Sequence, residues 1–415
     1  MRRSWLRVGT ERRTTRSRFS SAGSPLHSIS LLPHIRRQAE TLPRGLGESM
    51  KIAHLTSAHP RFDIRIFHKQ CRSLVRAGHE VTLVVADGQG AASVDGVGIV
   101  DVGAPSGRAA RMLHATRRVL SAAIAQDADA YHLHDPELLP IGVLLKRRGK
   151  IVIFDSHEDY PKQLRGKHYL SPMLCSMASA SVAAVERWAC PRFDAIVAAT
   201  PSIREKFDGF HRRVVEVNNY PMAEELLPDA ASAAREPRTA CYVGAIDVSR
   251  GIHEMLAAIA RTAPGTRLLL AGRFVQQSLR AESVAQEGWS RVEELGIVGR
   301  AGVRNMLARS SAGLVTLHPR LNYVDSQPIK MFEYMAAGVP VVCSSFPLWR
   351  RIVEGCGCGI CVDPMNPNEI ASAIDRLASN PDQVEEMGRR GRAAVRDRFN
   401  WAVEEAKLFE LYRSI

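Results

Sequence analysis

From Met50 onward, short apolar stretches alternate with longer stretches of helical period. "KIAHLT" (51–56) and "HEVTLVVA" (79–86) are typical of strands, and residues 65–77 between them are typical of a helix. Further strands are predicted at "VGIVDV", "DAYHLH", "KIVIFDS", "DAIVAAT" and "VVEVNN", with helices at 108–125, 136–148 and 172–190. This alternation favours a parallel sheet that is covered by helices on both faces.

After the Pro- and Ala-rich interval 221–238, the same alternation starts again. Strands are predicted at "TACYVGAI", "TRLLLAGR", "AGLVTLH", "VPVVCSS" and "CGICVD", with helices between them and two closing helices at 381–397 and from Trp401 to Tyr412. We therefore predict an α/β protein with two Rossmann-like domains, residues 50–220 and 239–397, which face each other across a cleft. Residues 221–238 are the expected linker, and residues 398–415 are expected to pack back on the first domain.

Residues 1–49 contain ten arginines and three glutamates, which is over half of the formal net charge of +13, and they show no sustained period. We expect them to be a disordered basic extension, either a targeting segment or sequence that precedes a true start at Met50. The mild positive excess in the rest of the chain does not indicate nucleic acid as a partner. No apolar run reaches the ~20 residues that span a bilayer.

Eight cysteines are scattered along the chain, except for the cluster "GCGCGIC", which lacks the ligand spacing of a zinc site. A reducing, cytoplasmic location is expected.

The stretch "YVDSQPIKMFEYMAAGVPVVCSS" (323–345) places charged side chains where a loop enters a helix and the helix leads to a strand. Pro328 suits the first turn of this helix and Gly338 suits its C-terminal cap. Asp325 and Ser326 lie in the loop before it. The free N–H groups at the start of such a helix favour a phosphate, and Glu333 lies far enough along to accept hydrogen bonds from a ribose diol.

Two arginines follow strands of the same half: Arg250 at the turn in "YVGAIDVSRGI" and Arg273 in "LLLAGRF". Together with Lys330 they offer three positive charges for a diphosphate, so no resident metal or other cofactor is expected. Each residue alone is equally typical of a solvated surface, but all three are expected at the carboxyl edge of one sheet, where open parallel sheets bind ligands.

The motifs "GAIDVSRG", "AGRF" and "DSQPIKMFEYMAAGVPVVCSS" resemble those of the group 1 (family 4) retaining glycosyltransferases of GT-B fold. The resemblance implies that Glu333 binds the nucleotide ribose, that Asp325 meets the donor sugar and that Arg250 contacts the diphosphate. Gly244, which opens the first motif, joins these donor residues. Two positions depart from the family pattern: Ala245 replaces the first of two basic residues, and Asp325 replaces the more usual glutamate.

In the first half, His132 and His134 end one predicted strand, and His157, Glu158 and Asp159 follow the next. These residue types also suit a metal-hydrolase site, although no closed metal-binding signature is present. The resemblance instead implies that His134 faces the donor sugar, with His157 and Glu158 on the acceptor side of the cleft.

The loop "SAHPRFDIRIF" stands where related enzymes have a glycine-rich acceptor loop. Arg61 and Asp63 are candidates for the acceptor side, because Arg61 or Arg65 suits a phosphate or carboxylate on the acceptor. An ion pair that fixes the loop to the following helix is the alternative interpretation.

These observations predict a metal-independent glycosyltransferase that moves a sugar from a UDP- or GDP-sugar to a hydroxyl acceptor with retention of configuration. The acceptor is expected to be a glycan or a lipid-linked glycan precursor. A nucleotide-sugar epimerase of the same fold and an inactive nucleotide-sugar-binding subunit are the alternatives. The basic stretch "LLKRRGK", ending at Lys150, is either a solvated helix end or a contact with the cytoplasmic face of the inner membrane.

Overall fold

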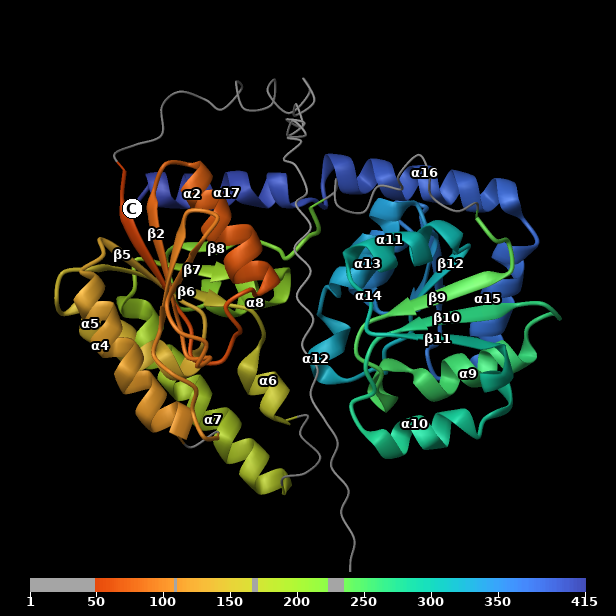
Figure 1. Cartoon of the computed structure of the whole chain (residues 1–415), viewed down its shortest axis with the longest axis horizontal. Coiled ribbons are helices and arrows are strands. Elements are labelled where there is room, and N and C mark those ends of the chain that lie inside the picture. The colour runs from red at the N-terminus through yellow and green to blue at the C-terminus, as the bar shows by residue number, and fades with distance from the viewer. Residues whose placement is uncertain (1–48, 108–109, 166–170, 223–234) are drawn as a thin grey trace, which may run out of the picture. The chain divides into compact units, whose positions relative to one another are not determined.

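Two β-sheets organise the residues that this computed structural model describes, which are 49–107, 110–165, 171–222 and 235–415 (Figure 1). Within these residues, the first sheet has the order β3-β4-β2-β1-β5-β6-β7-β8 and the second has the order β11-β10-β9-β12-β13-β14. All neighbouring strands are parallel except β3 and β4. Apart from β3 and β8 in the first sheet, both orders follow the doubly wound pattern 3-2-1-4-5-6. The predicted α/β class with two Rossmann-like domains is confirmed.

The first sheet and its helices come from residues 51–216. The elements are β1 (Lys51–Leu55), η1 (Ile64–Cys71), α2 (Arg72–Arg76), β2 (Glu80–Val85), β3 (Ala92–Val94), β4 (Val97–Asp101), η2 (Arg111–Ala115), α4 (Thr116–Gln126), β5 (Ala130–Leu133), η3 (Pro136–Leu138), α5 (Leu139–Lys146), β6 (Ile151–Ser156), α6 (Tyr160–Arg165), α7 (Pro172–Ala189), η4 (Cys190–Arg192), β7 (Ala195–Ala198), α8 (Pro201–Asp208) and β8 (Val214–Glu216).

The second sheet and the closing helices come from residues 239–413. The elements are β9 (Thr239–Val243), η6 (Val248–Arg250), α9 (Ile252–Arg261), β10 (Arg267–Ala271), α10 (Gln277–Val284), η7 (Glu287–Arg291), β11 (Val292–Gly296), α11 (Arg300–Arg309), β12 (Ala312–Val315), α12 (Leu321–Val324), α13 (Ile329–Ala337), β13 (Val341–Ser344), α14 (Pro347–Val353), β14 (Gly359–Val362), α15 (Pro367–Ala378), α16 (Pro381–Asp397) and α17 (Trp401–Arg413).

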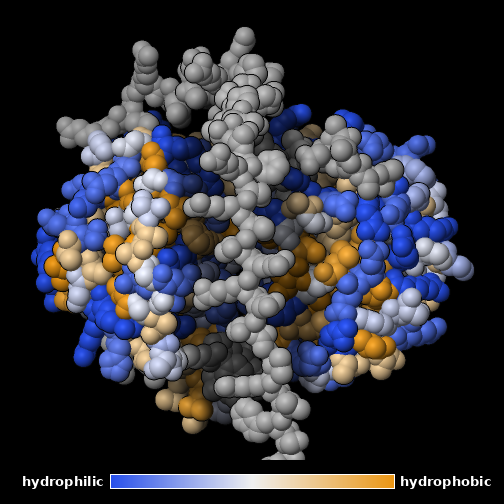
Figure 2. Space-filling model, in the orientation of Figure 1, coloured by the Kyte–Doolittle hydropathy of each residue, from blue (hydrophilic) through white to orange (hydrophobic). Residues whose placement is uncertain are grey.

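Each sheet separates two hydrophobic cores, because its central strands are apolar on both faces. In the second sheet, α9 and α15 cover one face while α11, α13 and α14 cover the other. In the first sheet, α4 and α5 cover one face while η1, α2 and α17 cover the other. Figure 2 shows that apolar residues reach the surface in patches among hydrophilic ones. Both sheets belong to one compact unit.

The C-terminal helix α17 packs on the first sheet, as predicted. Trp401, Leu408, Leu411 and Tyr412 are buried with residues of β1 and β2, and Trp401 Nε1 donates to Ser73 Oγ at 2.9 Å. The C-terminal helix, which follows the second sheet in the sequence, therefore supplies part of the hydrophobic core of the first domain.

Replacing Trp401 by alanine is expected to destabilise the protein by about 3–5 kcal/mol, because it opens a cavity in that core and removes the buried hydrogen bond to Ser73. Urea unfolding followed by circular dichroism measures the loss. The matched control is Val403→Ala on the exposed side of the same helix, which should change stability by less than about 0.5 kcal/mol. Equal unfolding midpoints for the two variants would contradict the assigned role of Trp401.

Strands β3 and β11 were not predicted from the sequence. β11, "VEELG", is a polar edge strand without the apolar run of its neighbours, and β3 spans three residues. α13 begins at Ile329, with Pro328 as its N-cap, one residue later than predicted. Residues 1–48 and 223–234 lie outside the described residues, so the proposed basic extension, the linker and the domain boundaries stay predictions. Among the described residues, no helix combines the length and apolar content that are needed to cross a bilayer.

Candidate functional site

A pocket of about 460 Å³ collects side chains that follow strands of both sheets. This volume lies in the range of small-molecule sites, which is roughly 300–1,000 Å³. The predicted site residues that line it are Gly244, Arg250, Asp325, Ser326, Lys330, Glu333, His157 and Glu158. The structure thus brings most of the residues that were predicted from the sequence together in this pocket.

Two cations converge over a glycine at the end of β9. A Cβ atom placed on Gly244 would lie 3.0 Å from Lys330 Nζ and 3.9 Å from Arg250 Nη1. Lys330 Nζ also lies 3.8 Å from the centroid of the Tyr242 ring. Gly244 has a φ of 129°, where a side chain would be strained, so this position combines an exposed backbone with two positive groups.

Lys330 Nζ is buried and has no hydrogen-bond partner within the described residues. Burial, reinforced by Arg250, lowers the pKa of Lys330 well below its usual value, while Glu333 opposes the shift. The ring face of Tyr242 compensates the charge only in part. An unpaired ammonium group is costly to bury, so its position at the pocket wall indicates an anionic ligand.

A second glycine lets the backbone turns after β9 and β10 touch. Gly272 has a φ of 145°, and a Cβ atom there would lie 1.8 Å from the carbonyl oxygen of Gly244. Any larger residue at position 272 would therefore displace the backbone of Gly244, over which Lys330 and Arg250 converge. Gly244 and Gly272 therefore help to position the part of the pocket that Lys330 and Arg250 line, which we call the cationic wall.

The loop before α13 is held by hydrogen bonds to three segments. The Ser326 hydroxyl donates to Tyr323 O at 2.8 Å, and Trp349 Nε1 donates to Ser326 O at 2.7 Å. Gln327 Oε1 accepts a hydrogen bond from the Tyr220 hydroxyl at 2.9 Å. The N–H groups at the start of α13 are fixed in place by these contacts, although the Ser326 hydroxyl is itself engaged with the backbone.

The two acids of the 323–345 stretch have different surroundings. Asp325 is half exposed, and its Oδ2 lies 3.1 Å from Nζ of Lys162 on α6. Glu333 is buried, and Arg300 Nη1 donates to its Oε1 at 2.7 Å. The structure therefore places one carboxylate at the exposed pocket mouth, paired with Lys162, and holds the other at the pocket wall.

On the first-sheet side, Asp155 at the end of β6 is the centre of a buried polar network. Its Oδ1 accepts from Arg65 Nη2 at 2.7 Å, and its Oδ2 accepts from Arg65 Nε at 2.9 Å and from Gln70 Nε2 at 2.6 Å. Burial alone would raise the pKa of Asp155, but the Arg65 guanidinium holds it well below its usual range. His157 Nε2 lies 3.2 Å from the same Oδ2, so this carboxylate orients the one histidine that lines the pocket.

His134 lies behind His157, away from the pocket lining. Its Nδ1 is 3.0 Å from His157 Nε2, and its Nε2 is 2.8 Å from Nδ1 of His54. The rings of His54, His132 and His134 stack with centroids 4.7 to 5.1 Å apart. Burial lowers the pKa of His134 to about 4. The prediction that His134 itself faces the donor stays a prediction, and in this structure it reaches the pocket through His157.

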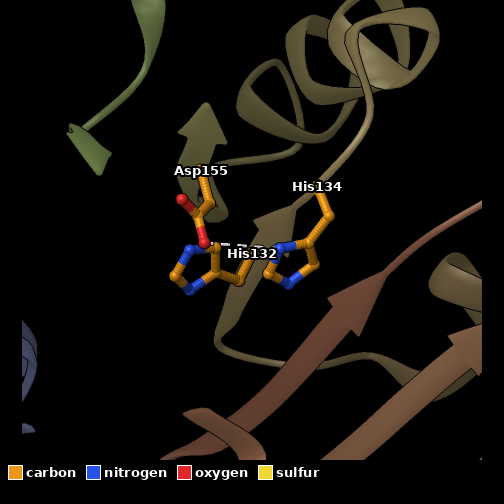
Figure 3. Close-up of side chains that lie close together, drawn as sticks. All are labelled: His132, His134 and Asp155. Atoms are coloured by element: carbon orange, nitrogen blue, oxygen red, sulfur yellow. Dashed lines mark ion pairs between the residues drawn. The ribbon is translucent and has the colours of Figure 1, made fainter. Parts of the chain in front are cut away.

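His132, His134 and Asp155 are the one group among the described residues whose ligand atoms lie together as a metal site requires, within 4.8 Å of one another (Figure 3). Both Asp155 oxygens already accept hydrogen bonds from the Arg65 guanidinium, which would repel a divalent cation. The donor set therefore does not fit a metal, and we derive no step from one here.

The other predicted residues lie outside the pocket lining. Arg61 forms a bidentate ion pair with Asp87 after β2, at 2.7 and 2.8 Å, and not with the following helix as the alternative interpretation expected. Asp63 caps η1 by accepting from the backbone N–H of Arg65 and Ile66. Arg273 is exposed, and its donor contact stays a prediction.

Three residues at the site were missed from the sequence. Lys162 lies three positions after the candidate cluster His157, Glu158 and Asp159, so attention to the whole turn after β6 would have found it. Tyr242 and Arg300 gave no such indication, because a ring inside a strand and an arginine at a helix start are common everywhere.

Two family models divide the chain between them. Residues 64–220 match "Glycosyl transferase 4-like domain", and residues 224–394 match "Glycosyl transferases group 1". Each model falls on one of the two sheets, and the second includes the whole cationic wall. The chain belongs to the group 1 glycosyltransferases of GT-B fold.

Curated relatives of this glycosyltransferase are distant. It is 25% identical over 263 residues to a glycogen synthase of Mycobacterium tuberculosis, covering 60% of each chain. It is 25% identical over 301 residues to a phosphatidyl-myo-inositol mannosyltransferase of Mycobacterium leprae, covering 70% of this chain and 74% of that one. The alignment with the glycogen synthase thus spans less than two thirds of that relative.

Solved structures support the fold of the glycosyltransferase. Sucrose-phosphate synthase from Thermosynechococcus elongatus superposes with a TM-score of 0.72 at 19% identity, over 88% of this chain and 98% of that one. HepE from Anabaena, solved in complex with UDP-glucose, superposes with a TM-score of 0.68 at 14% identity, over 88% and 100%. At such identities the likeness concerns the fold alone.

Proposed function

We propose that this glycosyltransferase moves a sugar from a nucleotide-diphosphate donor, a UDP- or GDP-sugar, to a hydroxyl group of a glycan or lipid-linked glycan acceptor. We further propose that the anomeric configuration is retained and that no metal is required. The observation behind this proposal is the buried ammonium of Lys330, which has no hydrogen-bond partner among the described residues and converges with Arg250 over Gly244.

The donor diphosphate is proposed to lie over Gly244, against both cations and the start of α13. Charge-assisted hydrogen bonds to phosphate oxygens would satisfy Lys330 Nζ, and Gly244 lets those oxygens approach the backbone. Glu333 then accepts the ribose hydroxyls, which requires Arg300 to share or release its Oε1 contact. The complex of HepE with UDP-glucose, a protein of the same fold, supports a nucleotide sugar as the ligand class.

Catalysis is proposed to come from stabilising charge as the bond between sugar and diphosphate breaks. Negative charge grows on the leaving diphosphate, where Lys330 and Arg250 compensate it, and positive charge grows on the sugar. Asp325 is the half-exposed carboxylate at the pocket mouth, and it can approach the sugar once its ion pair with Lys162 opens. Attack by the acceptor from the leaving-group side would retain configuration. Because the two cations supply the compensating charge, chelators should leave turnover unchanged.

The acceptor is proposed to enter beside His157 and Glu158, which line the opposite wall. Asp155 fixes the His157 ring, so this imidazole can position an acceptor hydroxyl without a change in its own orientation. We assign it a positioning role and name no general base.

Donor binding can be tested with Arg250→Gln, which keeps polarity and removes charge. Its affinity for UDP or GDP is expected to fall by about 10- to 100-fold, since a hydrogen bond to a charged group contributes roughly 1.5–3 kcal/mol. Isothermal titration measures the affinity. Arg261→Gln, at the exposed end of α9, is the control and should bind as the wild type does. Equal affinities in both variants would refute the diphosphate assignment.

The reaction class is decided by incubating the protein with a panel of UDP- and GDP-sugars and hydroxyl acceptors, with and without a chelator. Acceptor-dependent release of nucleoside diphosphate, with a product of unchanged anomeric configuration by NMR, supports the proposal. Inversion at the sugar C2 without an acceptor would identify an epimerase. Binding without either product would identify a nucleotide-sugar-binding subunit.

A further inference from the structure

Helix α7 (Pro172–Ala189) exposes large apolar side chains to water, whereas its buried side holds polar as well as small apolar residues. Its buried side includes Ser179, whose hydroxyl donates to Pro161 O at 2.9 Å, and Glu186, which pairs with Lys206 at 2.7 Å. On the exposed side, which also carries Ser176 and Ser181, apolar residues form a row that we call the α7 stripe. It consists of Met173, Leu174, Met177, Ala180, Ala184 and Trp188.

The members of the α7 stripe recur at helical spacing along its whole length. Met173, Met177, Ala180, Ala184 and Trp188 follow one another at intervals of three or four residues, so they form one continuous row. The exposed fractions are large: 70% for Met173, 51% for Leu174, 58% for Met177 and 44% for Trp188. A contiguous row of this size at a surface marks an interaction site.

The charge around the α7 stripe is positive. Between residues 171 and 192 the one acid is Glu186, which is buried, whereas Arg187 and Arg192 are exposed. The Arg192 guanidinium lies 5.4 Å from the centroid of the Trp188 ring. Helix α5 packs against α7 and is followed by the exposed pair Arg147 and Arg148, part of the basic stretch "LLKRRGK".

This combination fits an anionic lipid surface better than a second copy of the chain. Two copies of α7 in contact would place no exposed acid opposite the arginines, because Glu186 is buried and paired. Anionic lipids offer phosphates to arginine and an acyl boundary to methionine and tryptophan, which is the pattern of helices that lie in a membrane interface.

We propose that α7 docks in the surface of an anionic bilayer, with the α7 stripe in the acyl boundary and the flanking arginines on lipid phosphates. Helix α6 packs against α7 and supplies Lys162 and Gln163 to the pocket, so docking would bring the pocket rim to the membrane. If the proposed glycosyl transfer also holds, the acceptor hydroxyl belongs to a lipid-linked molecule.

Flotation of the full chain with vesicles tests the docking. The wild type should float with phosphatidylcholine vesicles that contain phosphatidylglycerol, and at least about tenfold less with phosphatidylcholine alone. The variant Met173→Ser/Met177→Ser/Trp188→Ser should lose flotation on both, and Arg187→Gln/Arg192→Gln should lose the preference for anionic vesicles. The control Val284→Ser/Met365→Ser removes exposed apolar side chains elsewhere and should float like the wild type.

Two results would overturn the docking. One is flotation of the Met173→Ser/Met177→Ser/Trp188→Ser variant, called the stripe variant, at the wild-type level, while its melting temperature equals that of the wild type. The other is a wild type that is dimeric in solution and a stripe variant that is monomeric, which would assign the α7 stripe to contact with a second copy.

Nucleoside diphosphate release in vesicle-free solution separates the docking proposal from the proposed glycosyl transfer. Flotation without turnover would contradict the transferase alone, and turnover without flotation would contradict the docking alone.

Discussion

Replacing Lys330 by methionine is expected to lower turnover by about 10²–10³-fold, the usual consequence of removing one group that compensates charge in a transition state. The ammonium is buried beside Arg250 and Gly244, where the proposed diphosphate would leave. Methionine has nearly the length and the apolar stem of lysine, so its side chain can still pack against the Tyr242 ring without the charge. Steady-state release of nucleoside diphosphate measures the effect.

The same substitution is expected to leave the free protein as stable as the wild type or more stable. Burial holds the pKa of Lys330 below that of an unfolded lysine, so the unfolded chain binds this proton more tightly. Lys330 therefore reduces stability at every pH below the unfolded pKa of about 10.4, and methionine removes that cost. The wild type should gain melting temperature on addition of UDP or GDP, and the variant should gain much less.

Lys150→Met is the matched control, since Lys150 pairs with Asp127 on the surface of the first half. It should alter neither turnover nor the thermal shift with nucleotide. A Lys330→Met variant with wild-type turnover, or one that melts several degrees lower without ligand, would show that Lys330 is a structural residue and remove the central support for the donor site.

The strand and helix alternation was predictable because the buried parts of parallel strands covered on both faces are apolar, as in "LLLA" of β10 and "AIVA" of β7. The polar edge strand β11 breaks that rule and was missed. The residues of the cationic wall were also predictable. Gly244, Arg250 and Lys330 each follow a strand or start a helix, and the doubly wound sheet brings such positions to one edge.

Pairings between distant residues were not predictable. Arg61 and Asp87 are 26 residues apart, and their ion pair depends on how the loops after β1 and β2 meet. The row of rings formed by His54, His132 and His134 exists because β1 and β5 are neighbours, which no single strand reveals. The sequence therefore drew attention to His132, His134 and His157 but not to His54, and the assignment of His134 to the donor stays a prediction.

Stability is expected to fall steeply as the pH drops from about 6.5 towards 5, because of this buried row. Burial lowers the pKa of His54 and His132 well below the usual value, and that of His134 to about 4. In the unfolded chain all three bind protons below about pH 6.5, so the unfolded state is favoured as the pH falls. Each proton changes the free energy of unfolding by about 1.4 kcal/mol per pH unit, so three give a slope of about 4 kcal/mol per unit.

One nearby histidine opposes this loss. Burial acts against the shift, but contacts with Asp63 and Asp135 raise the pKa of His59, so His59 stabilises the fold below its unfolded pKa and reduces the net slope. Asp155 does not contribute in this window, because its lowered pKa keeps it charged until the pH falls below that of an ordinary carboxyl group.

Urea unfolding at several pH values between 7.5 and 5.5 measures the slope. His132→Phe removes one of the three titrating groups and fills the same space, at the cost of the contact with the Tyr412 hydroxyl at 2.9 Å. Its stability should depend on pH about one third less steeply, whatever its absolute value. His114→Gln, on the exposed side of η2, should keep the wild-type slope. A wild-type stability that stays constant from pH 7.5 to 5.5 would mean that the three imidazoles are not held neutral in the fold.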